Sequence, residues 1–153
     1  MSESKGDGLC KFAYWNGFVV GAACCRLESL NKSDNNTAVA TAEAKSNDGT
    51  TTTSSTSSSK KQIYIMTLGV LAAYRGRQIG TQLIQSVLDH FESHMMDDEL
   101  KDVVEISLHV QISNEDAIKF YTERFGFEKG EIIENYYRRI DPPHCYKLSK
   151  KLR

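Results

Sequence analysis

Several patterns that mark specialised protein classes are missing from this 153-residue chain. No apolar run approaches the ~20 residues that span a bilayer. The four cysteines include no CxxC spacing, so neither a zinc site nor a disulfide framework is expected. The formal net charge is −1, and this near balance argues against a surface that binds nucleic acid or an anionic membrane.

The composition, 40% apolar and 25% charged, fits one globular domain. The N-terminal residues, MSESKGDG, lack the basic and apolar regions of a signal peptide. We therefore expect a cytoplasmic protein, with nuclear localisation also open. His90 and His94 are spaced i, i+4, but neither a third ligand nor a following Glu accompanies them, so we expect no metal.

A polar tract interrupts the domain at residues 29–61. It includes ten consecutive Ser and Thr residues, 50–59, and almost nothing apolar. Such a segment cannot bury enough surface to offset the entropy of ordering it, so we predict a disordered insertion. Because a long surface loop adds little closure entropy, the strands on its two sides can still pair as a hairpin.

Hydrophobic periodicity on either side of this tract predicts strands and helices. The dipeptide Asn16-Gly17 is a typical hairpin signal. The predicted strands cover residues 10–15, 18–28, 61–71, 103–110, 127–139 and 145–152, and the predicted helices cover residues 81–96 and 114–124. Since each helix joins two strands among antiparallel neighbours, we predict a mixed sheet with helices on its faces.

The stretch YIMTLGVLAAYRGRQIGT has the layout of a pyrophosphate-binding site. A strand leads through Gly69 into a loop rich in Arg and Gly, and an amphipathic helix follows. The first amides of a helix lack intrahelical acceptors and carry the positive end of the macrodipole, so they suit anionic phosphate. Arg75 and Arg77 add charge, while Gly76 and Gly80 allow close approach of the backbone. The alternative is an ordinary strand-to-helix turn with two solvated arginines.

The stretch LHVQISNEDAIKFY is the second informative one. His109 lies near the C-terminal end of a strand, Ser113 or Asn114 can cap the next helix, and Tyr121 lies about two turns inside it. If this strand is parallel to the strand that carries Tyr64, both helices begin at one edge of the sheet. Open sheets bind their ligands at that edge.

These motifs together resemble those of the GNAT acetyltransferases, and within that family those of the enzymes that acetylate protein N-termini. The resemblance rests on YIMTLG, RGRQIGT, LHVQISNEDAIKFY and NYYRRI, in that order, and covers nearly all of the chain outside the inserted tract. It implies the GNAT fold, an α/β architecture with a mostly antiparallel mixed sheet. Two parallel central strands of that sheet splay apart, and helices flank it.

The resemblance implies acetyl-CoA as co-substrate, with its pantetheine between the splayed strands, and no metal. The backbone of three strand residues would bind pantetheine, the loop would bind the pyrophosphate, and two residues of the second helix region would lie near the sulfur. In that order the matching positions are Leu68, Gly69 and Val70; Arg75, Gly76, Arg77, Gln78, Ile79, Gly80 and Thr81; and Asn114 and Tyr121.

Tyr64 and His109 match the catalytic pair of the family, which acts as a relay through an ordered water. A base must take a proton from the substrate ammonium before attack, and an α-amino pKa near ~7.7–8.0 makes this a modest demand. His109 has the better ordinary pKa for this task, whereas Tyr64 suits orienting water. Without the resemblance, a structural His and a packed Tyr would be the more usual interpretations.

Peptide recognition is assigned by the same resemblance. The matching positions are Met66, Tyr136, Tyr137, Arg138, Arg139 and Ile140. The implied substrates are protein N-terminal peptides that retain Met followed by a hydrophobic residue. The implied partners are the auxiliary and catalytic subunits of a NatA-type complex at the ribosome. Two alternatives are transfer to the ε-amino group of lysine and a weakened, acetyl-CoA-binding subunit of such a complex.

The chain departs from the family pattern at two places. Gln78 stands where the pyrophosphate loop has Gly, so its side chain would crowd the phosphates or force a positive φ. The family also begins with a strand and two helices, whose connecting loop carries a Phe-Pro segment. This chain begins at what resembles the second strand, and its only prolines are Pro142 and Pro143.

Overall fold

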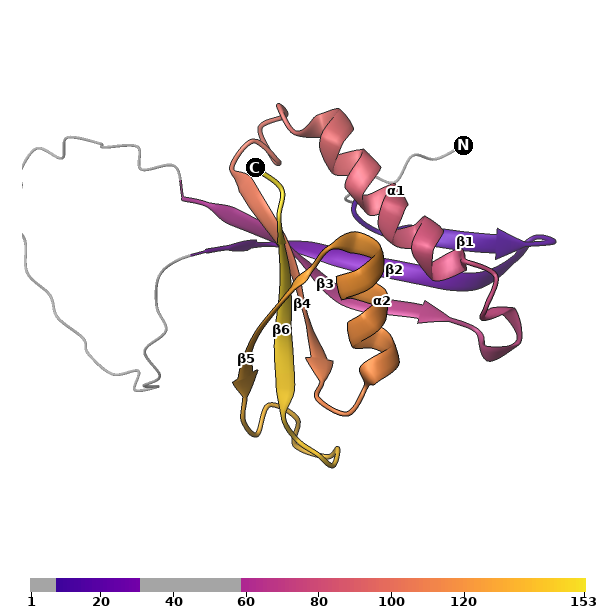
Figure 1. Ribbon diagram of the computed structural model, residues 1–153. Helices are drawn as coiled ribbons and strands as arrows, with labels where there is room; N and C mark the ends of the chain where they lie inside the picture. The colour runs from indigo at the N-terminus through magenta and orange to yellow at the C-terminus, as the bar shows by residue number, and fades with distance from the viewer. Residues whose placement is uncertain (1–7, 31–58) are drawn as a thin grey trace, which may run out of the picture.

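A computed structural model of the chain describes residues 8–30 and 59–153. Within these ranges six strands form one sheet in the order β1-β2-β3-β4-β6-β5 (Figure 1). The elements are β1 (Lys11–Trp15), β2 (Phe18–Ser29), β3 (Lys61–Val70), the 3₁₀ helix η1 (Ala72–Tyr74), α1 (Ile79–His94), β4 (Val103–Gln111), α2 (Glu115–Phe125), β5 (Glu128–Ile133) and β6 (Cys145–Lys151). Neighbouring strands are antiparallel except β3 and β4, which are parallel. The predicted fold class, a mixed sheet with helices, is confirmed.

The central parallel strands β3 and β4 pair only over their first halves. Their last paired rung joins Tyr64 to Ser107, although β3 continues to Val70 and β4 to Gln111. Figure 1 shows the two strands running apart beyond this point. The pairing of β3 with β2 skips Met66, and a residue inserted in this way bends a strand. The bulge therefore lies next to the point where β3 leaves β4.

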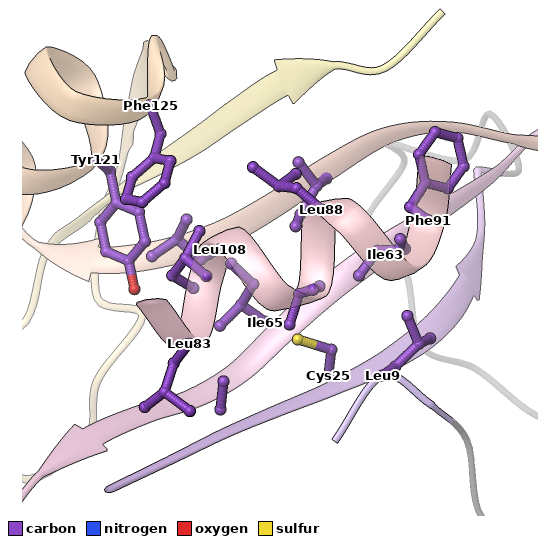
Figure 2. Packing of buried hydrophobic residues seen from close by; sticks show 14 of the residues in the cluster. Leu9, Cys25, Ile63, Ile65, Leu83, Leu88, Phe91, Leu108, Tyr121 and Phe125 are labelled. Carbon is purple, nitrogen blue, oxygen red and sulfur yellow. The ribbon is translucent and has the colours of Figure 1, made fainter. Parts of the chain in front are cut away.

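Both helices cover the same face of the sheet (Figure 1). Figure 2 shows the resulting core, in which Leu83 and Leu88 of α1 pack over Ile63 and Ile65 of β3, with Tyr121 of α2 at one end. The helices form because their apolar residues recur at helical spacing. In the described part of the chain, no helix combines the length and apolar character that a membrane span requires.

Local sequence signals set the turns and helix ends. Asn16 and Gly17 adopt φ values of 47° and 83°, as a two-residue hairpin turn of this type requires, so the predicted β1–β2 hairpin is correct. The Asn114 side chain accepts a hydrogen bond from the amide of Ala117 at 3.2 Å and caps α2.

The strands that flank the polar tract pair as predicted. Beyond the β2–β3 ladder, the amide of Leu30 donates to the carbonyl of Lys60 at 2.7 Å, so the two ends of the tract lie side by side. The predicted disorder concerns residues 31–58 and lies outside the described residues.

The prediction of a strand over residues 127–139 is wrong in its second half. β5 ends at Ile133, and the chain turns at Asn135, which has a φ of 54°. Asn tolerates this conformation better than most residues do, because its short side chain bonds locally. Tyr136 and Tyr137 therefore lie in the β5–β6 loop and do not alternate across a strand.

Ile84→Ala should lower the free energy of unfolding by about 2–5 kcal/mol, because Ile84 is fully buried and its removal leaves a cavity. Ile132 is 50% exposed on β5, so Ile132→Ala is a matched control that should change stability by only about 0.5 kcal/mol. Urea denaturation followed by circular dichroism measures both values. Equal losses would contradict this description of the core.

Candidate active site

Tyr64 and His109 meet where β3 and β4 separate. The Tyr64 hydroxyl lies 2.7 Å from His109 Nδ1, and the two ring centroids are 5.4 Å apart. Tyr64 belongs to the last paired rung of the parallel strands, and His109 lies two residues beyond that rung on β4. Strand alternation points both side chains to the face of the sheet opposite the helices. The structure thus joins directly two residues that are far apart in the sequence.

The surroundings set the protonation states of this pair. Burial raises the pKa of the Tyr64 phenol, and the nearby Tyr136 hydroxyl adds to the effect. Burial also lowers the pKa of His109, and the charge of Lys147 lowers it further, with Glu28 opposing both. The phenol is therefore protonated and the imidazole neutral near pH 7. In these states the Tyr64 hydroxyl donates to His109 Nδ1.

Tyr136 covers the pair from the β5–β6 loop. Its hydroxyl lies 3.4 Å from both the Tyr64 hydroxyl and His109 Nδ1, and its ring stacks on His109 with centroids 4.5 Å apart. Gln111 at the end of β4 donates to the carbonyl of Pro142 at 2.8 Å, which fixes this loop against the sheet. A residue predicted from the resemblance as part of a peptide wall thus contacts both members of the pair.

A cavity of about 310 Å³ occupies the gap between β3 and β4. Its lining combines both strands, the start of α2 and the β5–β6 loop, namely Ile65, Met66, Thr67, Leu68, Leu108, His109, Val110, Gln111, Asn114, Ala117, Tyr121, Tyr137 and Ile140. Arg138 and Arg139, also predicted as substrate residues, are exposed and do not line it. Across residues 8–30 and 59–153, no three His, Cys, Asp or Glu side chains gather in a way that would hold a metal ion.

A second cavity, of about 240 Å³, lies at the start of α1. Its lining is Val70, Tyr74, Arg75, Gly76, Gln78, Ile79, Gly80, Thr81, Phe120 and Arg124. The Arg75 guanidinium is anchored by a 3.0 Å hydrogen bond from Nε to the carbonyl of Val70. Arg77 does not join the lining, because its guanidinium lies 5.2 Å from the ring centroid of Trp15. Gly69 lines a third cavity, of about 380 Å³, beside β2.

Gln78 adopts a positive φ of 61° directly before α1. A side chain at this position is expected either to crowd the phosphates or to force a positive φ, and the structure has the positive φ. Gly76, at φ 77°, occupies a separate left-handed position in the same loop. The exposed side chain of Gln78 lines the second cavity. The first amides of α1 lack intrahelical acceptors and point out of the N-terminal end of the helix, where this cavity lies.

Arg124 and Phe120 are site residues that the sequence did not indicate. Arg124 Nη1 donates to Thr81 Oγ1 at 3.2 Å, so a cation from α2 reaches the first turn of α1. The ring of Phe120 lies beside Gly80. Helical periodicity places Arg124 only at the solvated end of α2. Its approach to α1 depends on how the two helices pack.

Comparison with known proteins identifies the family. A family model described as Acetyltransferase (GNAT) family matches residues 2–127. The chain belongs to the GNAT acetyltransferase family. The GNAT fold accounts for the separation of its two parallel strands and for the loop between β3 and α1.

Individual relatives agree with this assignment. The chain is 40% identical over 145 residues to N-alpha-acetyltransferase 50 of Danio rerio, and 35% identical over 145 residues to a probable N-acetyltransferase, san, of Drosophila melanogaster. These matches cover 95% of this chain and only 66% and 60% of the two relatives. The chain thus spans about two thirds of the first relative and 60% of the second. The resemblance to N-alpha-acetyltransferase 50 among GNAT proteins, which the sequence motifs indicate, is confirmed.

A solved structure of Arabidopsis thaliana Naa50, in complex with the bisubstrate analogue CoA-Ac-MVNAL, is similar to this GNAT chain. The TM-score is 0.64 and the sequence identity is 41%, with 94% of this chain and 72% of that chain covered.

Gln78→Gly should make the protein more stable than Gln78→Ala by about 1 kcal/mol, because Ala retains the steric penalty of a positive φ that Gly avoids. Both variants lose the same polar side chain, so the comparison isolates the effect of the positive-φ backbone conformation on stability. Thermal unfolding of the two variants measures the difference. If they are equally stable, the left-handed backbone at this position carries no strain.

Proposed function

We propose that this chain binds acetyl-CoA and transfers the acetyl group to the α-amino group of a protein N-terminus. The observation that carries the proposal is the 2.7 Å contact between the Tyr64 hydroxyl and His109 Nδ1 at the edge of the gap between β3 and β4. The pair is half-buried and next to a cavity, as an acid–base relay requires.

The shape and chemistry of the gap suit the coenzyme. Within the described residues, β3 beyond Tyr64 has no partner strand on the side of β4, so its amides and carbonyls are available to an extended ligand with amide groups. Pantetheine is such a ligand. At the far end of β3, Arg75, Arg124 and the start of α1 supply positive charge and backbone donors for the diphosphate.

The proposed chemistry of the pair is proton removal. When bound, acetyl-CoA would supply the acetyl thioester: the C–N bond to the neutral amine forms, the C–S bond breaks, and coenzyme A leaves as the thiol with a proton from the attacking nitrogen. The Tyr64 oxygen accepts a proton from the substrate ammonium while its own proton passes to His109 Nδ1, which leaves a neutral amine and an imidazolium. Since the pKa of Tyr64 is raised and that of His109 is lowered, a concerted transfer avoids a free phenolate.

The peptide substrate would enter over Tyr136. Met66, Tyr137 and Ile140 form an apolar rim on the cavity that the pair adjoins, and such a rim selects apolar side chains by burial. The similar Arabidopsis protein is in complex with an analogue whose peptide reads MVNAL, Met followed by hydrophobic Val. We therefore propose substrates that retain Met before a hydrophobic residue. From the family resemblance of the sequence motifs we also propose a cytoplasmic protein that docks on a NatA-type complex.

The purified chain should bind acetyl-CoA and acetylate a Met-Leu peptide faster than an internal lysine on an N-terminally blocked peptide. Isothermal calorimetry measures binding, and mass spectrometry of the products measures transfer. Preference for the lysine would favour the ε-amino alternative. Binding without transfer would favour a weakened subunit, and the absence of binding would reject the proposal.

His109→Gln should reduce kcat by about 100-fold, because it removes the proton acceptor of the relay. In the wild type, the rate should fall as the pH drops through the lowered His109 pKa, below its ordinary value of 6.5, because protonated imidazole accepts no proton. The residual activity of the variant should lack this acidic limb. Measured pH–rate profiles of both proteins, at saturating acetyl-CoA, provide the test.

Tyr64→Phe should cause a loss of similar size, since it removes the hydroxyl that His109 contacts. Tyr14→Phe removes a hydroxyl from an exposed tyrosine of β1 and serves as the matched control. Unchanged kcat in Tyr64→Phe would exclude the phenol from the relay.

A further inference from the structure

Two polar side chains are buried beside the Tyr64–His109 pair, on the same face of the sheet. Gln62 of β3 is 7% exposed and Ser107 of β4 is 0% exposed, and apart from tyrosine and cysteine no other polar residue in the described part of the chain is buried. Ser107 Oγ donates to Gln62 Oε1 at 2.7 Å. An apolar pair would fill the same space without the cost of dehydrating polar groups. The burial of two polar side chains at this place therefore indicates a function beyond packing.

The hydrogen bonds continue from this pair across the sheet. Gln62 Nε2 donates to Glu28 Oε2 of β2 at 3.0 Å. Glu28 Oε1 accepts from Arg26 Nε at 2.7 Å, and Arg26 Cζ lies 5.4 Å from the centroid of the Tyr64 ring. In the register of β2 and β3, Glu28 is opposite Gln62 and Arg26 is opposite Tyr64. The network thus crosses three strands and ends on the ring of Tyr64.

The buried end of this network can hold its exposed end in place. The side chains of Arg26 and Glu28 are 57% and 29% exposed, and an ion pair at this level of exposure is weakly held by itself. The Glu28 carboxylate only accepts hydrogen bonds, so the Gln62 amide turns its nitrogen toward Glu28 and its oxygen toward Ser107. The Ser107 hydroxyl donates to that oxygen and holds the amide in this orientation. The amide nitrogen is then directed at Glu28, which holds the guanidinium over the ring.

We propose that Gln62 and Ser107 are positioning residues for the transfer reaction. Through Glu28 and Arg26 they hold the Tyr64 ring so that its oxygen stays in contact with His109. The inference rests on the proposed function and assigns to it four side chains outside the predicted site. Tyr64 is then held from two sides, by a cation on its ring and by an imidazole at its hydroxyl.

The test is the double variant Q62M/S107A, which replaces both buried polar groups by apolar ones and leaves neither without a partner. Its unfolding midpoint should stay within about 4 °C of the wild type, and its affinity for coenzyme A within about twofold. By contrast, kcat should fall about tenfold with KM for the peptide nearly unchanged, because only the relay geometry is disturbed. Q85M makes the same Gln-to-Met change on the exposed face of α1 and should leave kcat unaltered.

Arg26→Met adds a coupling measurement. It should lower kcat in the wild type by a similar factor and should have little further effect in Q62M/S107A, because the anchor of the guanidinium is already lost. The proposal would be overturned if the loss of kcat in Arg26→Met multiplied with that in Q62M/S107A when the variants were combined. It would also be overturned if Q62M/S107A kept the kcat of the wild type. A wild type that transfers no acetyl group would instead refute the proposed function.

A measurement that does not depend on activity distinguishes failure of the positioning role from failure of the proposed function. The NMR signals of the Tyr64 ring, assigned by their loss in Tyr64→Phe, should shift in Q62M/S107A as the ring gains freedom. Those of the exposed Tyr14 should stay in place. Tyr64 signals that are identical in both proteins would refute the positioning role, whatever the activity.

Discussion

The proposed site depends on the end of the parallel pairing between β3 and β4 after the rung that joins Tyr64 to Ser107. Up to that rung the strands exchange backbone hydrogen bonds. Beyond it the backbone of β3 is unpaired toward β4, and a cavity of about 310 Å³ opens. The bulge at Met66 provides the bend. An ordinary sheet, paired along its whole length, would have neither the cavity nor unpaired backbone groups for a ligand.

The two faces of β3 carry side chains of different kinds, apolar on one face and polar on the other. Ile63 and Ile65 of β3 point into the core under α1, where apolar burial stabilises the sheet. Gln62 and Tyr64 alternate with them and point to the opposite face, where polar groups meet. Because the period of a strand is two, the core residues fix the position of the polar ones. Packing on one face thus sets the geometry of the relay on the other.

Much of the architecture could be predicted from local patterns. Hairpin signals, helical spacing and strand alternation predict all eight regular strands and helices of the described residues, because each pattern acts over a few neighbouring residues. The β5–β6 loop was mispredicted as strand because the left-handed turn at Asn135 has no strong local signature. The tyrosines that follow it contact His109 or line the cavity through the anchoring of that loop to β4.

The sequence by itself determined the family, and it led to the proposal of a pyrophosphate-binding loop and of Tyr64 and His109 as the catalytic pair, since these rest on short motifs that can be recognised without distant contacts. Only the tertiary structure decided that these two side chains touch, that Arg124 reaches Thr81, and that Gln62 connects three strands. Such contacts join residues as many as 45 positions apart. They arise from strand register and helix packing, which a local pattern does not specify.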